Sequence, residues 1–102
     1  MKILAIEHAL PSASPEDFQR CAQEEAARAW ELYQQGLIRE LYFRADRPEA
    51  VLVLECPDLA AAQRALDSLP LVRNGLIIFE LIPLAAYPGF ARLFAASKGA
   101  AP

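Results

Sequence analysis

Glu25 is the residue whose type and position point most directly to chemistry. On a helical wheel of about 100° per residue, residues 15–35 carry an apolar stripe, and Glu25 falls inside it, between Cys21 and Leu32. A carboxylate that faces a sheet must find a cation or a hydrogen-bond donor, or else hold a proton at a raised pKa. Such a group is a candidate general base or acid. The alternative is that its long stem reaches the rim of the helix and pairs with an arginine.

A second set of candidates lies in residues 37–44, which are predicted to form an edge strand. Alternation divides the segment into two faces. Ile38, Glu40, Tyr42 and Arg44 share one face, and Leu37, Arg39, Leu41 and Phe43 share the other. Glu40 and Tyr42 could line a cavity mouth and assist catalysis, and Arg44 and Arg39 could bind a substrate carboxylate by a two-pronged contact. Edge strands also carry charges simply to discourage pairing.

His8 is a third candidate, since it is the one histidine of the chain. It shares a strand face with Leu4 and Ile6. A lone histidine in that position is more often a hydrogen-bonded core residue than a catalyst. Glu7 and Glu80 are further carboxylates on otherwise apolar strands.

The residue sets that metals and common cofactors require do not occur. One His and two widely separated Cys, neither of them in a CxxC, offer no metal ligands at a known spacing. No phosphate-binding glycine loop and no nucleophile elbow is present. Cys21 and Cys56 are expected to be reduced, buried thiols. We therefore expect chemistry without a metal or a cofactor.

The candidate residues lie on elements that follow the order βαββαβ. Strands are expected over Lys2–Leu10, Leu37–Arg44, Ala50–Glu55 and Leu76–Ile82. One helix starts at Ser14-Pro15 and ends at Gly36, and a second opens at Pro57-Asp58. This order predicts a ferredoxin-like α+β sandwich, with one four-stranded antiparallel sheet and both helices on one face.

The length of 102 residues leaves room for one domain, 1–102. Phe90, Leu93 and Phe94 have helical spacing, so a short terminal helix is expected to dock on the body. Residues 96–102 are expected to be a frayed tail.

Apolar residues on both faces of the third and fourth strands predict a partner. Val51 and Val53 point opposite to Leu52 and Leu54, so the face of the sheet that carries no helices is also apolar. An exposed apolar sheet is unusual on a monomer. We therefore expect a second copy of the chain to cover this face, in a homodimer or a higher homo-oligomer. The alternative is that the C-terminal tail folds back over this face.

Charge and hydropathy exclude several other partners. The net charge is −3, without basic runs, so nothing favours nucleic-acid binding. No apolar stretch approaches the roughly 18 residues that span a bilayer, and the N-terminal run meets a charge too early for a signal peptide. A soluble, cytoplasmic protein is expected.

Several short runs resemble the muconolactone delta-isomerase family over nearly the whole chain. They are Gly36-Leu37-Ile38-Arg39, Arg44, Ser68-Leu69-Pro70-Leu71, Phe79-Glu80, Pro83-Leu84 and Tyr87-Pro88. The resemblance implies the dimeric α/β-barrel version of the ferredoxin-like fold. It also implies an isomerase of aromatic catabolism that moves a proton within an unsaturated lactone, without metal or cofactor, and assembles as dimers or decamers.

The resemblance matches Glu25 to a helix glutamate of the family and Arg44 to an arginine that ends the second strand. The chain departs from the family pattern at Val72–Gly75, at Glu40-Leu41-Tyr42 and at Tyr87, where the isomerases carry a histidine. These positions are expected at the pocket mouth, so they bear on the substrate.

Three functions remain open for a fold of this kind. An isomerase needs one base and one donor or cation for the developing oxyanion. A cofactor-independent oxygenase would consume oxygen with a quinol substrate. A non-catalytic dimer that binds a small molecule would lose stability or association, but no turnover, when Glu25 is replaced.

Overall fold

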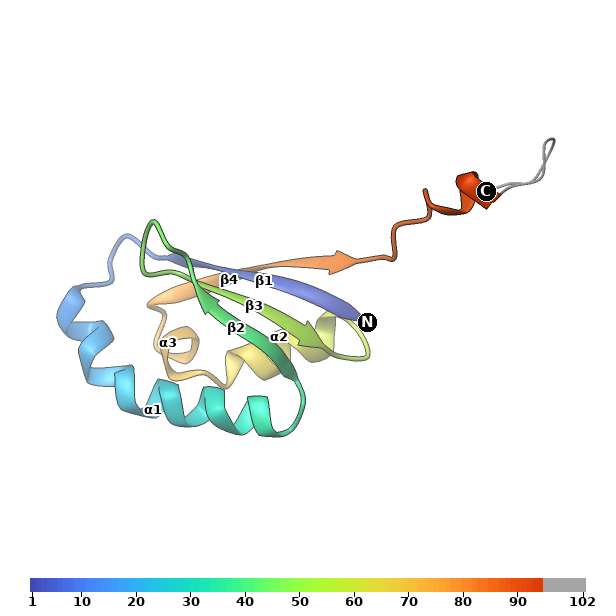
Figure 1. Ribbon diagram of the computed structural model, residues 1–102. Coiled ribbons are helices and arrows are strands. Elements are labelled where there is room, and N and C mark those ends of the chain that lie inside the picture. Colours follow the sequence, from blue (N-terminus) through green and yellow to red (C-terminus); the bar gives the residue numbers. More distant parts are fainter. Residues whose placement is uncertain (95–102) are drawn as a thin grey trace.

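The computed structural model describes residues 1–94 and consists of one antiparallel sheet with helices on one side (Figure 1). The sheet order is β2-β3-β1-β4. The strands are β1 Lys2–Ala9, β2 Ile38–Phe43, β3 Ala50–Glu55 and β4 Ile77–Leu84. The helices are α1 Pro15–Gln34, α2 Leu59–Asp67, α3 Pro70–Arg73 and α4 Ala91–Phe94. The predicted ferredoxin-like α+β fold is confirmed, and the tail expected at 96–102 lies outside the described residues.

The start of α1 follows the predicted chemistry. The Ser14 hydroxyl accepts a hydrogen bond from the Asp17 N–H at 3.2 Å, and the Asp17 carboxylate accepts one from the Ser14 N–H at 3.1 Å. Together these bonds satisfy two backbone donors that the first turn leaves free. After the last turn, Gly36 takes a φ of 81°, where a side chain would be strained. Both ends of α1 are thus set by local sequence.

The core lies between the sheet and its helices. Alternate residues of β1 and β3 point into this layer, and α1 and α2 contribute Leu32, Ala62 and Leu66, all fully buried. β1 pairs with β3 and β4, and β3 pairs with β1 and β2, so β1 and β3 are the two central strands of the sheet. Side chains of β1 and β3 that point toward the helices therefore have a neighbouring strand on each side.

The opposite side of the sheet carries no helix, and we call it the open face. Its apolar residues are half-buried or exposed, in contrast to the buried residues with which they alternate on β1 and β3. It comprises Leu4, Ile6, His8, Glu40, Tyr42, Val51, Val53, Ile78, Glu80 and Ile82. The predicted two-sided apolar character of β3 and β4 is confirmed.

A bulge in β2 corrects the predicted division of that strand. Ile38 pairs with Leu54 and Glu40 with Val53, so Arg39 is an extra residue. One extra residue inverts the alternation beyond it. Ile38 therefore shares the helix side with Leu41 and Phe43, whereas Glu40 and Tyr42 lie on the open face.

Two features near the C-terminal half differ from the prediction. The short helix α3 was not predicted, and its first turn begins at Pro70, whose ring suits that position. α4 forms as expected but does not dock. Residues 85–94 run away from the body (Figure 1), and Phe90 is 67% exposed. Up to residue 94, the chain does not fold back over the open face.

No helix in the part of the chain up to residue 94 is both long enough and apolar enough to cross a membrane.

Candidate functional site

A cavity of about 940 Å³ separates α1 from the sheet. Small side chains on α1 create this space, since Ala22 and Ala26 face the sheet without filling the gap. The walls are mainly apolar. They include Phe18 and Ala29 of α1, Leu41, Phe43 and Leu52 of the sheet, Phe79 of β4, and Leu69 and Leu71 beside α3.

Glu25 reaches this cavity from α1. Its Oε1 accepts a hydrogen bond of 2.9 Å from the backbone N–H of Leu71, so the short helix α3 positions the carboxylate. Burial raises the pKa of Glu25, and the bond from Leu71 opposes this. The charge of Glu7 raises the pKa further, and Arg73 lowers it. Glu25 is thus a half-buried carboxylate that faces the interior, and it is not paired at the rim with an arginine.

Glu7 reaches the same cavity from β1. It alternates with the buried Ile3 and Ala5, and it is only 6% exposed. Its Oε1 accepts a hydrogen bond of 3.0 Å from the Ala50 N–H. Burial raises the pKa of Glu7, the bond from Ala50 opposes this, and the charge of Glu49 adds to the rise. The alternation with Ile3 and Ala5 is the sequence signal that identifies this residue.

The charged residues of β2 lie elsewhere. Glu40 accepts a hydrogen bond of 2.8 Å from the Tyr42 hydroxyl, which raises the pKa of Tyr42. Tyr42 lines the cavity, but Glu40 does not. The Arg39 Nε donates to the Gly36 carbonyl at 2.7 Å. Arg39 also lies outside the cavity.

Arg44 lies directly after β2 and contacts the turn that connects β2 to β3. Its guanidinium donates to both carboxylate oxygens of Asp46, at 2.9 and 2.6 Å, and it does not line the cavity. The cation on the cavity wall, among the residues described, is Arg47, whose Nε lies 2.7 Å from Oε1 of Glu49.

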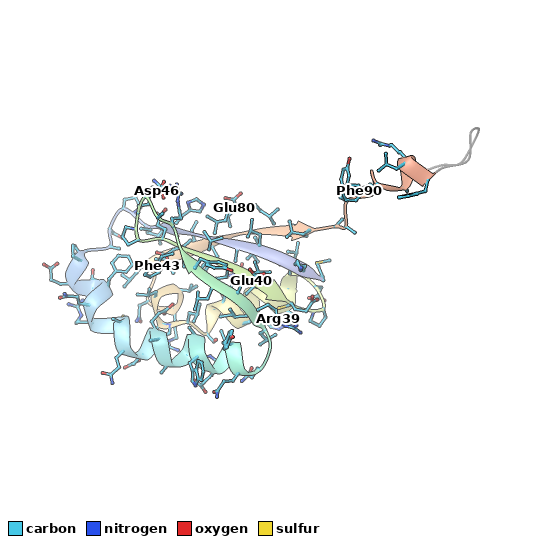
Figure 2. All side chains as sticks on the ribbon, viewed as in Figure 1. Arg39, Glu40, Phe43, Asp46, Glu80 and Phe90 are labelled. Atoms are coloured by element: carbon cyan, nitrogen blue, oxygen red, sulfur yellow. The ribbon has the colours of Figure 1, made fainter. Side chains whose placement is uncertain are left out.

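His8 lies on the open face and not at the cavity. Its Nε2 is 3.1 Å from Oε1 of Glu80 on the neighbouring strand β4 (Figure 2). Its side chain is 43% exposed, so it is not a core residue. Of the predicted site residues, Glu25 therefore reaches into the cavity. Tyr42 borders the cavity, but its hydroxyl bonds to Glu40 on the open face. His8, Arg39, Glu40 and Arg44 lie outside the cavity.

The two cysteines are unpaired and differ in environment. Cys56 is buried, as predicted, and burial raises its pKa. Cys21 is only partly buried, because it lies at the edge of α1, where the Asn74 amide donates to its sulfur at 3.4 Å. Over residues 1–94, no group of three or more His, Cys, Asp or Glu side chains could hold a metal ion.

A four-stranded antiparallel sheet with helices on one face defines a ferredoxin-like α+β protein, and a mainly apolar cavity that two carboxylates reach lies between its layers. The model of the muconolactone delta-isomerase family matches residues 4–89, and the chain belongs to this family.

The structure also resembles a crystal structure of muconolactone isomerase. The TM-score is 0.71 and the sequence identity 23%, over 86% of this chain and 92% of the other. At this identity the likeness concerns the fold. Comparison of the sequence with curated proteins gives no significant match.

Proposed function

We propose that the protein is a cofactor-independent isomerase that moves a proton within a small unsaturated lactone or a related compound. The observation that carries this proposal is the Glu25 carboxylate, which faces an apolar cavity and has a raised pKa. A base with a raised pKa can both take and return a proton near neutral pH. The family to which the chain belongs supports the same type of reaction.

The reaction needs few groups. Glu25 takes a proton from a carbon conjugated with the lactone carbonyl, and the electron pair of that C–H bond forms a new C=C bond. Negative charge develops on the carbonyl oxygen. Glu25 then returns the proton at the other end of the conjugated system, which regenerates the carbonyl and the carboxylate. The mainly apolar walls carry few groups other than Glu7 that could compete for the proton.

We also propose that two copies associate through their open faces. The support is a sheet surface that includes Leu4, Ile6, Val51, Val53 and Ile82, which a second copy would cover with identical residues. Light scattering is then expected to give about twice 11.2 kDa. A mass near 11 kDa at micromolar concentration would contradict the dimer.

We also propose that the protein acts in the cytoplasm, in the breakdown of aromatic compounds. Two unpaired cysteines fit a reducing compartment. The catabolic role rests on the family alone.

The test compares Glu25→Gln with Glu24→Gln, which changes an exposed neighbour on the same helix. Incorporation of deuterium from D2O into an unsaturated lactone reports proton transfer by NMR. We expect Glu25→Gln to slow it by about a hundredfold or more, with Glu24→Gln unchanged. Oxygen uptake with a quinol, without lactone exchange, would instead indicate an oxygenase. Equal rates for both variants would exclude Glu25 as the base.

A further inference from the structure

The turn between β2 and β3 brings a pair of opposite charges to the cavity wall. Arg47 and Glu49 both line the cavity, and the Arg47 Nε lies 2.7 Å from Oε1 of Glu49. The Glu49 side chain is 16% exposed, whereas that of Arg47 is 53% exposed. Arg47 therefore lies at the border between the cavity and solvent, with a largely buried carboxylate beside it.

The backbone of the turn sets the relative positions of these two residues. Pro48 separates them, and its ring fixes its own φ and favours an extended conformation at Arg47. The Glu49 N–H donates to the Arg47 carbonyl at 2.8 Å, and the Arg44 N–H donates to the Glu49 carbonyl at 2.9 Å. The ion pair is thus built on a closed turn and is in place before any ligand binds.

The two arginines of the turn differ in how many of their nitrogens face acids. Nε and Nη2 of Arg44 both donate to Asp46, and its Nη1 lies 3.7 Å from Glu49. Within residues 1–94, Arg47 pairs with Glu49 alone, and the closest approach is through Nε. The edge of its guanidinium that the two η nitrogens form is therefore left for another acceptor. This edge matches the two oxygens of a carboxylate.

We propose that Arg47 binds a carboxylate of the ligand and that the site selects unsaturated lactones that carry such a group. This inference rests on the proposed isomerase function and adds the ligand class and the residue that determines it. Among the residues described, Arg47 is the cation on the cavity wall. The binding role expected for Arg44 and Arg39, which lie outside the cavity, therefore falls to Arg47.

The other charges of the site fix the orientation of such a ligand. Glu7 and Glu25 reach the cavity between its apolar walls and repel a second carboxylate. Over residues 44–49 two arginines balance two acidic residues, so the turn has no net charge that would repel an anion. At the half-exposed Arg47 the ligand carboxylate keeps part of its hydration, which lowers the desolvation cost. The lactone ring then lies among the apolar walls, on the side of Glu25.

The test compares Arg47→Met with Arg44→Met, a matched change on the same turn. Methionine keeps an apolar stem but removes the charge and the donors. The probes are two butenolide lactones that differ in one group, a ring carboxymethyl or a ring methyl, and NMR titration gives the affinity of each. We expect wild type to prefer the carboxymethyl lactone. Arg47→Met should lower its affinity for that lactone by about tenfold to a hundredfold, whereas Arg44→Met should leave it unchanged.

The methyl lactone reports whether the cavity of the variant is intact. Its affinity is expected to be the same in wild type and Arg47→Met. Equal losses for both lactones in Arg47→Met would mean that Arg47 acts on the shape of the cavity, and would overturn the inference. A loss in Arg44→Met as large as in Arg47→Met would overturn it too, as would a wild type that binds both lactones equally.

Turnover separates this inference from the proposed function. If wild type exchanges deuterium into the carboxymethyl lactone, Arg47→Met should raise KM and leave kcat nearly unchanged, because Arg47 contacts a part of the ligand that does not react. A fall in kcat with an unchanged KM would contradict a binding role. Selective binding of the carboxymethyl lactone through Arg47, without any deuterium exchange, would refute the isomerase and uphold the inference. Exchange that is equally fast with both lactones would do the reverse.

Discussion

Glu7 and Glu25 approach one cavity from β1 and α1, and the charge of Glu7 raises the pKa of Glu25. Burial is the larger cause for both residues, so folding binds protons to this pair more tightly than the unfolded chain does. As the pH rises from 4.5, the ordinary value for both groups, through their raised folded-state values, the folded protein loses stability.

Glu7→Gln is expected to remove part of this loss of folding stability at higher pH. Glutamine keeps an oxygen for the Ala50 N–H but carries no proton to release. The free energy of unfolding of the variant, relative to wild type, should therefore increase as the pH rises above 4.5, the ordinary value of this carboxyl group. Urea unfolding at several pH values measures it, with Glu24→Gln as the control. If the free energy of unfolding depends on pH in the same way in wild type and Glu7→Gln, ionisation of Glu7 does not destabilise the folded protein.

Filling the cavity from α1 should weaken the binding of a small unsaturated lactone without unfolding the protein. Ala26 lines the cavity, so Ala26→Leu places extra carbon atoms where a ligand would lie. We expect the affinity for this lactone to fall about tenfold or more. The exposed Ala27, which does not line the cavity, gives the matched control Ala27→Leu. Unchanged affinity in Ala26→Leu would place the ligand elsewhere.

A charge on the open face should separate the proposed dimer. Ile78 is 51% exposed on β4, and Ile78→Lys would set two lysines against the partner's apolar sheet. Light scattering is expected to show a monomer, with circular dichroism unchanged. Leu59→Lys makes a similar change at a residue of α2, which is 40% exposed and lies away from the open face. A dimer that persists in Ile78→Lys argues for another interface.

Truncation of a buried leucine should lower the free energy of unfolding far more than truncation of an exposed leucine. Leu66 of α2 is fully buried, so Leu66→Ala is expected to lower the free energy of unfolding by about 2–5 kcal/mol. Leu93 of α4 is 75% exposed, and Leu93→Ala should change it by less than about 0.5 kcal/mol. Similar losses in both variants would mean that α4 packs against the body in solution.

The parts of the fold that could be predicted are those with local causes. A few neighbouring residues determine each of these features, which are the Ser14 cap, the Gly36 turn and the alternation in β3. The bulge at Arg39 could not be predicted, because it depends on how β2 pairs with β3. The helix α3 was missed for a similar reason, since one turn has too few residues for a periodic pattern.

The candidate site was predictable in part. The position of Glu25 follows from a single helical wheel, and alternation places Glu7 on the core side of β1. That the two share a cavity depends on the separation between α1 and the sheet, which no local pattern encodes. The place of Arg44 depended on Asp46, two residues further along the hairpin, which binds it outside the cavity.

The bulge in β2 determines which side chains this strand presents to the cavity. With Arg39 as an extra residue, Ile38, Leu41 and Phe43 all lie on the helix side, and Leu41 and Phe43 form part of the cavity wall. If Arg39 instead took a regular paired position after Ile38, Leu41 and Phe43 would turn outward, and Glu40 and Tyr42 would take their places. Among relatives of this chain, a one-residue gap at this point would therefore remove the bulge and keep the apolar wall, whereas a relative of the same length needs the bulge to keep it.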